Sequence, residues 1–122
     1  MPRFEARALS YAAYASAVAG LAHRLRALSA GGERVAVVMP NGLETAVALL
    51  GAMAAGAQVA PVNPGFTDPE VLRALKDAEP RIILCRADWA ERARRLAGEA
   101  GAAHVVVLGA GGERIEKWAA DT

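Results

Sequence analysis

The stretch RVAVVMPNGLETAVALLGAMAAGAQVAPV, residues 34–62, decides the fold. It begins with a β-branched run, passes through a polar break into an alanine-rich helical segment, and ends in a second apolar run. Two further runs follow, RIILC at residues 81–85 and HVVVL at 104–108, so the four runs start about 23 residues apart. Short apolar runs that alternate with helices are typical of parallel sheets covered on both faces. We predict a three-layer α/β fold, Rossmann-like, with a mainly parallel four-stranded sheet and flanking helices. The pattern does not determine the order of the strands.

Asn41 and Glu44 mark the start of the helix between the first two runs. A strand that turns through Asn-Gly into a helix can cradle a phosphate, but neither the G-x-G-x-x-G fingerprint nor the Walker loop is present. Glu44 would also repel a phosphate. The spacing matches a capping box, in which the Asn41 side chain accepts the N–H of Glu44 and Glu44 reaches back to that of Asn41. We therefore predict a structural cap, and a helix over residues 41–56 that ends at a left-handed Gly56.

The other helices have their own start and stop signals. The first is predicted over residues 10–28 with Ser10 as its cap. The third begins at Thr67 or Asp68, with a proline in its first turn, and stops before Pro80. The fourth is predicted to open at Asp88, with Glu91 three residues later, and to close at Gly101.

Composition narrows the function. The chain of 122 residues has a net charge of +1, with 14 basic and 13 acidic residues, so we expect neither a nucleic-acid partner nor binding to an anionic membrane. A single cysteine and an N-terminus without an apolar signal core indicate a reducing, cytoplasmic setting. Residues 45–67 form a stretch without charged side chains, and this stretch is long enough to span a bilayer. The glycines and prolines in their second half favour a buried helix followed by a buried strand, and no transmembrane segment.

Few side chains suggest chemistry of their own. His23 and His104 have no Cys or carboxylate at metal-ligand spacing, so no metal site is predicted. Cys85 ends the third run without a paired histidine, which favours a small buried residue over a nucleophile. A basic run follows that cysteine and is interpreted either as a solvated helix face or, for Arg86 at a strand's carboxyl end, as a phosphate contact. The run comprises Arg86, Arg92, Arg94 and Arg95.

The most unusual predicted loop consists of Asn63, Pro64, Gly65 and Phe66. It follows the carboxyl end of the second predicted strand, exposes an aromatic residue and precedes a helix N-terminus. In doubly wound folds ligands bind outside these strand ends. A simple turn is the alternative interpretation.

Several segments follow one another in a specific order and spacing: Leu9-Ser10-Tyr11, residues 33–41 (ERVAVVMPN) with Glu44, residues 51–57 (GAMAAGA), and residues 61–64 (PVNP). Taken together, they resemble the amino-terminal portion of the adenylate-forming enzymes, which include the acyl-CoA synthetases, the luciferases and the adenylation domains of peptide synthetases. The match covers roughly residues 8–108, and its specificity lies in the order and spacing of the segments.

The resemblance implies a two-step reaction. A carboxylate attacks the α-phosphate of Mg-ATP to give an acyl-adenylate and pyrophosphate, and a thiol, usually that of coenzyme A, then displaces AMP. The family's phosphate loop, its aromatic-Gly-x-Thr-Glu motif, its ribose-binding Asp and its catalytic Lys would lie beyond Thr122. We therefore expect residues 1–122 to form an amino-terminal subdomain of an acyl-CoA synthetase that has no catalytic residue of its own and is inactive alone. ATP, Mg²⁺ and coenzyme A are implied only for the whole enzyme.

The resemblance also suggests one binding site. In acetyl-CoA synthetases the corresponding loop lies near coenzyme A, and the segment after the next strand supplies arginines to its phosphates. The loop matches Asn63, Pro64, Gly65 and Phe66 of this chain, and the arginine segment loosely matches Arg86. Alternatives are part of a peptide-synthetase adenylation domain, or a stand-alone non-catalytic α/β binding module. The expected partners are the remainder of the synthetase and, through exposed apolar faces, a second copy of the chain.

Overall fold

The computed structural model describes residues 11–28 and 31–109. Four helices and four strands alternate along them: α1 (Tyr11–Ala27), β1 (Arg34–Val38), α2 (Leu43–Ala54), β2 (Gln58–Val62), α3 (Asp68–Ala78), β3 (Ile82–Arg86), α4 (Ala90–Ala100) and β4 (His104–Leu108). A short 3₁₀ helix, η1 (Ala87–Trp89), precedes α4. The strands form one sheet in the order β2-β1-β3-β4, and every pair is parallel. The predicted α/β fold with a four-stranded parallel sheet is confirmed.

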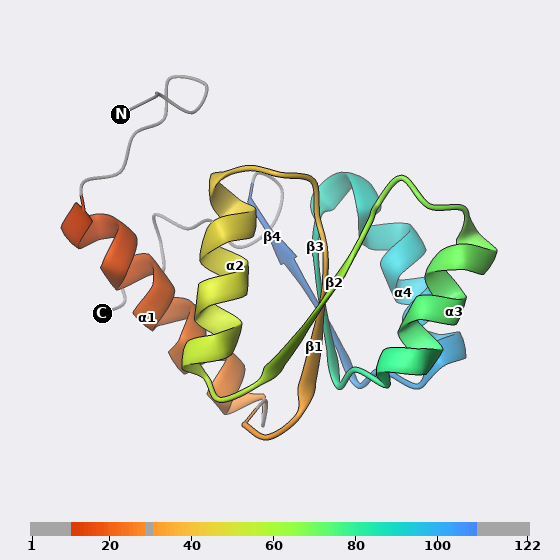
Figure 1. The fold of residues 1–122 in the computed structure, drawn as a ribbon, viewed down its shortest axis with the longest axis horizontal. Coiled ribbons are helices and arrows are strands. Elements are labelled where there is room, and N and C mark those ends of the chain that lie inside the picture. The colour runs from red at the N-terminus through yellow and green to blue at the C-terminus, as the bar shows by residue number, and fades with distance from the viewer. Residues whose placement is uncertain (1–10, 29–30, 110–122) are drawn as a thin grey trace.

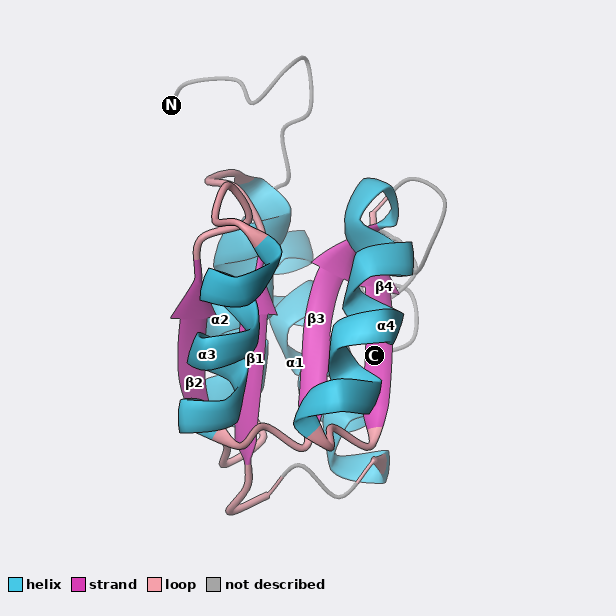
Figure 2. Cartoon of the chain, turned by 90° about the vertical axis from the view of Figure 1, so that its right-hand side faces the viewer, coloured by secondary structure: helices cyan, strands magenta, loops and turns pink. Residues whose placement is uncertain are grey.

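The sheet is the middle of three layers. Helices α1 and α2 cover one face, and α3 and α4 cover the other (Figures 1 and 2). Successive residues of β1 point to opposite faces, so Val35 and Val37 pack with α1 and α2 while Ala36 and Val38 pack with α3 and α4. This alternation explains why the run is apolar throughout, since both faces of a central parallel strand are buried.

β2 differs from the other strands because it lies at the edge of the sheet. Only Val62 among its five residues is buried, and Pro61 is exposed opposite Val37 of β1. A proline lacks the N–H that a central strand needs, and an edge strand tolerates this loss. The expected buried strand is therefore a partly exposed edge strand. The uncharged stretch divides between α2 and β2, and no helix in the described ranges is long and apolar enough to cross a membrane.

The start of α2 corrects the predicted capping box. The N-cap is Gly42, without a side-chain cap hydrogen bond, and its carbonyl oxygen accepts the N–H of Ala46 at 3.1 Å. The helix therefore begins after Asn41, whose predicted bond to Glu44 does not form. A Cβ placed on Gly109 would lie 3.5 Å from Glu44 Oε2, so the Glu44 side chain lies beside the end of β4 and not over Asn41. The predicted left-handed residue after this helix, Gly56, is confirmed with φ of 85°.

The two later helices give one confirmation and one correction. Thr67 caps α3 in a full capping box, in which Thr67 N donates to Glu70 Oε1 at 2.8 Å and Glu70 N donates to Thr67 Oγ1 at 3.4 Å. Asp88 does not cap α4, because η1 intervenes and Trp89 is the N-cap residue, without a side-chain cap bond. α4 closes at Gly101 with φ of 80°, as predicted. The predicted cap Ser10 lies outside the described residues.

Candidate functional site

The loop after β2, residues 63–66, is a tight turn that its own sequence determines. Phe66 N donates to the carbonyl oxygen of Asn63 at 3.2 Å, and Gly65 N donates to Asn63 Oδ1 at 2.8 Å. Asn at the first position of a turn and Pro at the second favour this geometry, because the Asn side chain accepts a nearby N–H and Pro fixes its own φ. We call these four residues the 63–66 loop. The turn faces the carboxyl end of the sheet, where α/β proteins bind ligands.

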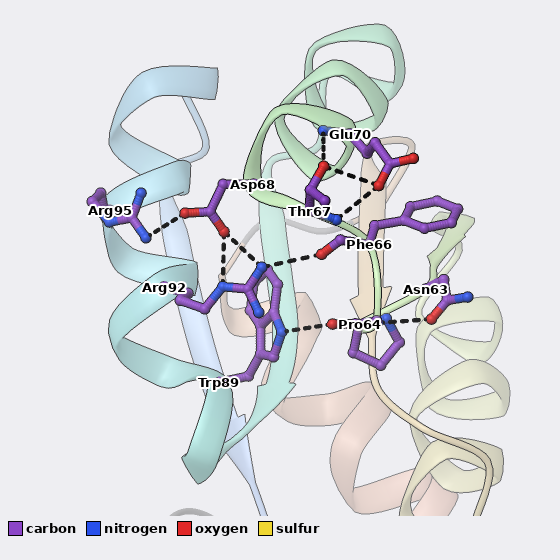
Figure 3. Close-up of polar contacts among 10 residues, drawn as sticks. Asn63, Pro64, Phe66, Thr67, Asp68, Glu70, Trp89, Arg92 and Arg95 are labelled. Atoms are coloured by element: carbon purple, nitrogen blue, oxygen red, sulfur yellow. Dashed lines mark hydrogen bonds and ion pairs between the residues drawn. The ribbon is translucent and has the colours of Figure 1, made fainter.

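Two side chains from the η1–α4 region hold this loop from outside. Trp89 Nε1 donates to the carbonyl oxygen of Pro64 at 3.2 Å, and Arg92 Nη2 donates to that of Phe66 at 3.2 Å (Figure 3). The Arg92 guanidinium also lies over the indole ring, 4.5 Å from its centroid. A cation over a tryptophan face is attracted by the ring quadrupole. Trp89 is almost fully buried in the hydrophobic core on this face of the sheet, with 7% of its surface exposed.

Asp68 of α3 organises the arginines of α4. Its Oδ1 accepts bonds from Arg92 Nε at 2.9 Å and Nη2 at 2.6 Å, and its Oδ2 accepts one from Arg95 Nη2 at 2.8 Å. These hydrogen bonds hold the pKa of Asp68 below its ordinary value of 3.8, and the bond from Arg95 has the larger effect, followed by those from Arg92. The carboxylate of Asp68 therefore joins two guanidinium groups of α4.

A pocket of about 420 Å³ lies on the other side of the loop, at the carboxyl ends of β1 and β2. Its polar side chains are Asn41, Thr45 and Asn63, and none of its lining residues is charged. Apolar residues and three prolines form the rest of its wall: Val37, Met39, Pro40, Leu49, Pro61, Val62 and Pro64. The structure thus brings Asn41, which sequence analysis assigned to a cap, next to the predicted site residue Asn63. The Thr45 hydroxyl donates to the carbonyl oxygen of Pro40 and so holds this turn closed.

The structure places the predicted site residues at two strand ends. Phe66 is exposed, with 40% of its surface open, and Arg86 is the exposed last residue of β3. In the described ranges, the side-chain bonds that reach the 63–66 loop from later in the chain come from Trp89 and Arg92, not from Arg86. Cys85 is fully buried, and this burial raises its thiol pKa to about 11. The prediction of a small buried cysteine is confirmed.

The sequence did not predict any role for Trp89. It also did not predict that Asp68 binds Arg92 and Arg95. Sequence analysis interpreted the basic run as a solvated face or a phosphate contact, whereas two of its members bind a carboxylate 24 and 27 residues earlier in the chain. A local signal did exist, because Arg92 and Arg95 are three residues apart and therefore share one face of a helix. In the part of the chain that the structure describes, no three His, Cys, Asp or Glu side chains gather as metal ligands would.

The parallel sheet, the helices on both faces and the loops at its carboxyl edge define a three-layer α/β domain. The chain belongs to the AMP-binding enzyme family, whose model matches residues 2–121.

The relatives are much longer proteins. A long-chain-fatty-acid–CoA ligase of Salmonella typhimurium is 31% identical over 105 residues, which are 86% of this chain and 17% of the ligase. An isonitrile lipopeptide synthase of Streptomyces coeruleorubidus is 35% identical over 94 residues, covering 73% of this chain and 6% of the synthase. Among solved structures, apo MatB from Rhodopseudomonas palustris is 30% identical with a TM-score of 0.76, over 92% of this chain and 23% of MatB. The chain thus spans about a sixth of the ligase.

Proposed function

We propose that this chain is an amino-terminal part of an AMP-forming acyl-CoA synthetase, and that its 63–66 loop and Arg86 form one wall of the coenzyme A site. In the whole enzyme a carboxylate would attack the α-phosphate of ATP, release pyrophosphate and form an acyl-adenylate. The coenzyme A thiol would then attack the acyl carbon and release AMP. The family match and the long-chain-fatty-acid–CoA ligase relatives support this class of reaction.

One observation carries the assignment of the wall: the exposed side chains of Phe66 and Arg86 both lie at the carboxyl edge of the sheet. The Phe66 ring can stack on the adenine of coenzyme A, and stacking of a base on an aromatic side chain contributes about 1–3 kcal/mol. Arg86 is exposed at the end of β3. Arginine is well suited to phosphate groups because its guanidinium donates in a planar fork.

Titration of the 122-residue chain with coenzyme A, followed by amide chemical shifts, tests this wall. We expect weak binding with shifts concentrated at residues 63–66 and Arg86. Phe66→Ala should weaken binding by about 5- to 150-fold, the range of a lost base stack, and Arg86→Gln should weaken it less. Arg73→Gln, which removes an exposed arginine of α3, is the matched charge control. Shifts that avoid the loop, or equal effects of all three changes, would refute the assignment.

The second candidate is an adenylation domain that loads the thiol of a carrier protein, which the isonitrile lipopeptide synthase relative favours. A carrier presents phosphopantetheine without the adenine nucleotide of coenzyme A. Titration with phosphopantetheine separates the two cases. If it shifts the same residues as strongly as coenzyme A does, the carrier-loading candidate is favoured.

A further inference from the structure

We propose that Trp89 and Arg92 are positioning residues, which set the 63–66 loop against the end of β3 and so align the two parts of the proposed binding wall. The identity of the ligand rests on the proposed function above. The placement of the loop rests on contacts within this chain.

The loop needs an outside support because its internal bonds fix its shape but not its direction. The N–H groups of Gly65 and Phe66 are both used inside the turn, where they bond to Asn63. The carbonyl oxygens of Pro64 and Phe66 point out of the turn and accept the bonds from Trp89 and Arg92 (Figure 3). Both outside bonds lie on the α4 side, while the pocket beside Asn63 lies on the α2 side of the loop.

The sheet alone does not align the two parts of the wall. The loop follows β2 and Arg86 ends β3, and β1 lies between these two strands. Two strand spacings amount to roughly 10 Å, so no ladder hydrogen bond joins the loop to the end of β3. Trp89 follows Arg86 by three residues and reaches back to Pro64 across the end of β1. This bond therefore ties the two strand ends directly.

Arg92 is itself held in place before it reaches the loop. Asp68 accepts two of its N–H groups, and the indole of Trp89 packs against its guanidinium plane. Arg95 binds the same carboxylate through its other oxygen but has no bond to the 63–66 loop. The two arginines therefore share an ion-pair partner and differ in their contact with the loop, which makes Arg95 the matched control.

Hydrogen exchange of the Gly65 and Phe66 amides in the 122-residue chain, together with the coenzyme A titration, tests the proposal. Trp89→Phe and Arg92→Gln should each speed exchange at these amides and weaken coenzyme A binding by about two- to tenfold, the range for one hydrogen bond. Arg95→Gln should leave both measurements near those of the parent chain. Arg92 is 34% exposed, so Arg92→Gln keeps the test informative even if Trp89→Phe fails to fold.

The possible failures are distinguishable. Unchanged exchange at Gly65 and Phe66 in Arg92→Gln, or equal acceleration in Arg95→Gln, would overturn the positioning role. Faster exchange with unchanged coenzyme A affinity would also overturn it, because the loop would then not be positioned for that ligand. If the parent chain binds no coenzyme A while exchange responds as expected, the loop support stands and the proposed function fails.

Discussion

Gly51 of α2 lies directly against Leu21 of α1. A Cβ built on Gly51 would lie 2.8 Å from Leu21 Cδ2 and 3.0 Å from its Cβ and Cγ, and Leu21 is fully buried. Glycine is therefore the residue that lets the two helices on this face of the sheet approach each other. Gly98 in α4 is the opposite case, because nothing lies within 4 Å of a Cβ at that position.

The two glycines should respond in opposite directions to the same substitution. Gly98→Ala should raise the free energy of unfolding by up to about 1 kcal/mol, since alanine is the better helix former. Gly51→Ala gains the same helix propensity but overpacks the α1–α2 contact, which costs about 1–3 kcal/mol. We expect a net loss of about 1 kcal/mol, measured by urea unfolding. Equal stabilisation by both changes would contradict the close approach.

Asp68 should make part of the stability depend on acid pH. Its pKa is lower in the folded chain than its ordinary value of 3.8, so its contribution is present above that value and is lost as the pH falls through the lower folded pKa. Asp68→Asn should therefore flatten the fall in stability below about pH 4. Urea unfolding along a pH series measures this, with Asp77→Asn, on the same helix, as the control. If the free energy of unfolding fell equally with decreasing pH in the parent chain, in Asp68→Asn and in Asp77→Asn, the result would argue against a stabilising role of the Asp68 ion pairs.

Cys85 should be protected from thiol reagents while the chain is folded. Burial keeps it from solvent, and a pKa raised to about 11 leaves roughly one thiol in a thousand ionised at pH 8. We expect alkylation by iodoacetamide to be at least about a hundredfold slower in buffer than in guanidinium chloride. Rapid alkylation of the folded chain would show that this side of β3 opens easily.

Exposed apolar residues on α2 should drive self-association. Leu50 is 41% exposed and Met53 is 54% exposed, three residues apart and so on one helix face. We expect a dimer at high concentration by sedimentation velocity, and a shift towards monomer in the double variant Leu50→Gln, Met53→Gln. Phe66→Ala removes an exposed ring elsewhere and should leave the association unchanged. A monomeric parent chain at high concentration would refute this prediction.

The isolated chain should not form acyl-adenylates. The phosphate loop and catalytic Lys that the family resemblance implies are not among these 122 residues. We expect no ATP-dependent release of pyrophosphate above background with a long-chain fatty acid. Release that depends on both the acid and the chain would show that this piece is catalytic on its own.

The strands and one helix cap were predictable because their signals are local. The apolar runs matched β1 to β4 within one residue at each end, and Thr67, one of the two residues predicted to start the third helix, is its N-cap residue. The cap at Asn41 was predicted wrongly, since α2 begins after Gly42 and the side chain of Glu44 lies beside the end of β4. The spacing of residues around Asn41 cannot reveal a contact between Glu44 and the end of β4, which lies far away in the sequence.

The support of the 63–66 loop was not predictable for a related reason. Trp89 and Pro64 are 25 residues apart, and they meet because the strand order places β2 and β3 on the two sides of β1. Hydrophobic periodicity identifies strands but not their order. The predicted cap at Asp88 was wrong because η1 precedes α4 and its last residue, Trp89, is the N-cap residue of that helix.

Pro61 makes the two edges of the sheet, β2 and β4, unequal in their ability to pair with a further strand. Gln58 donates its N–H towards the β1 side, to Glu33, so along β2 the backbone groups that face outward belong to Val59 and Pro61. Pro61 has no N–H, which leaves a single outward donor on this border. On β4, where His104 donates inward to Arg81, the outward residues are Val105 and Val107, and both carry an N–H. An added strand, from this chain or another, would therefore form a complete ladder beside β4 and an interrupted one beside β2.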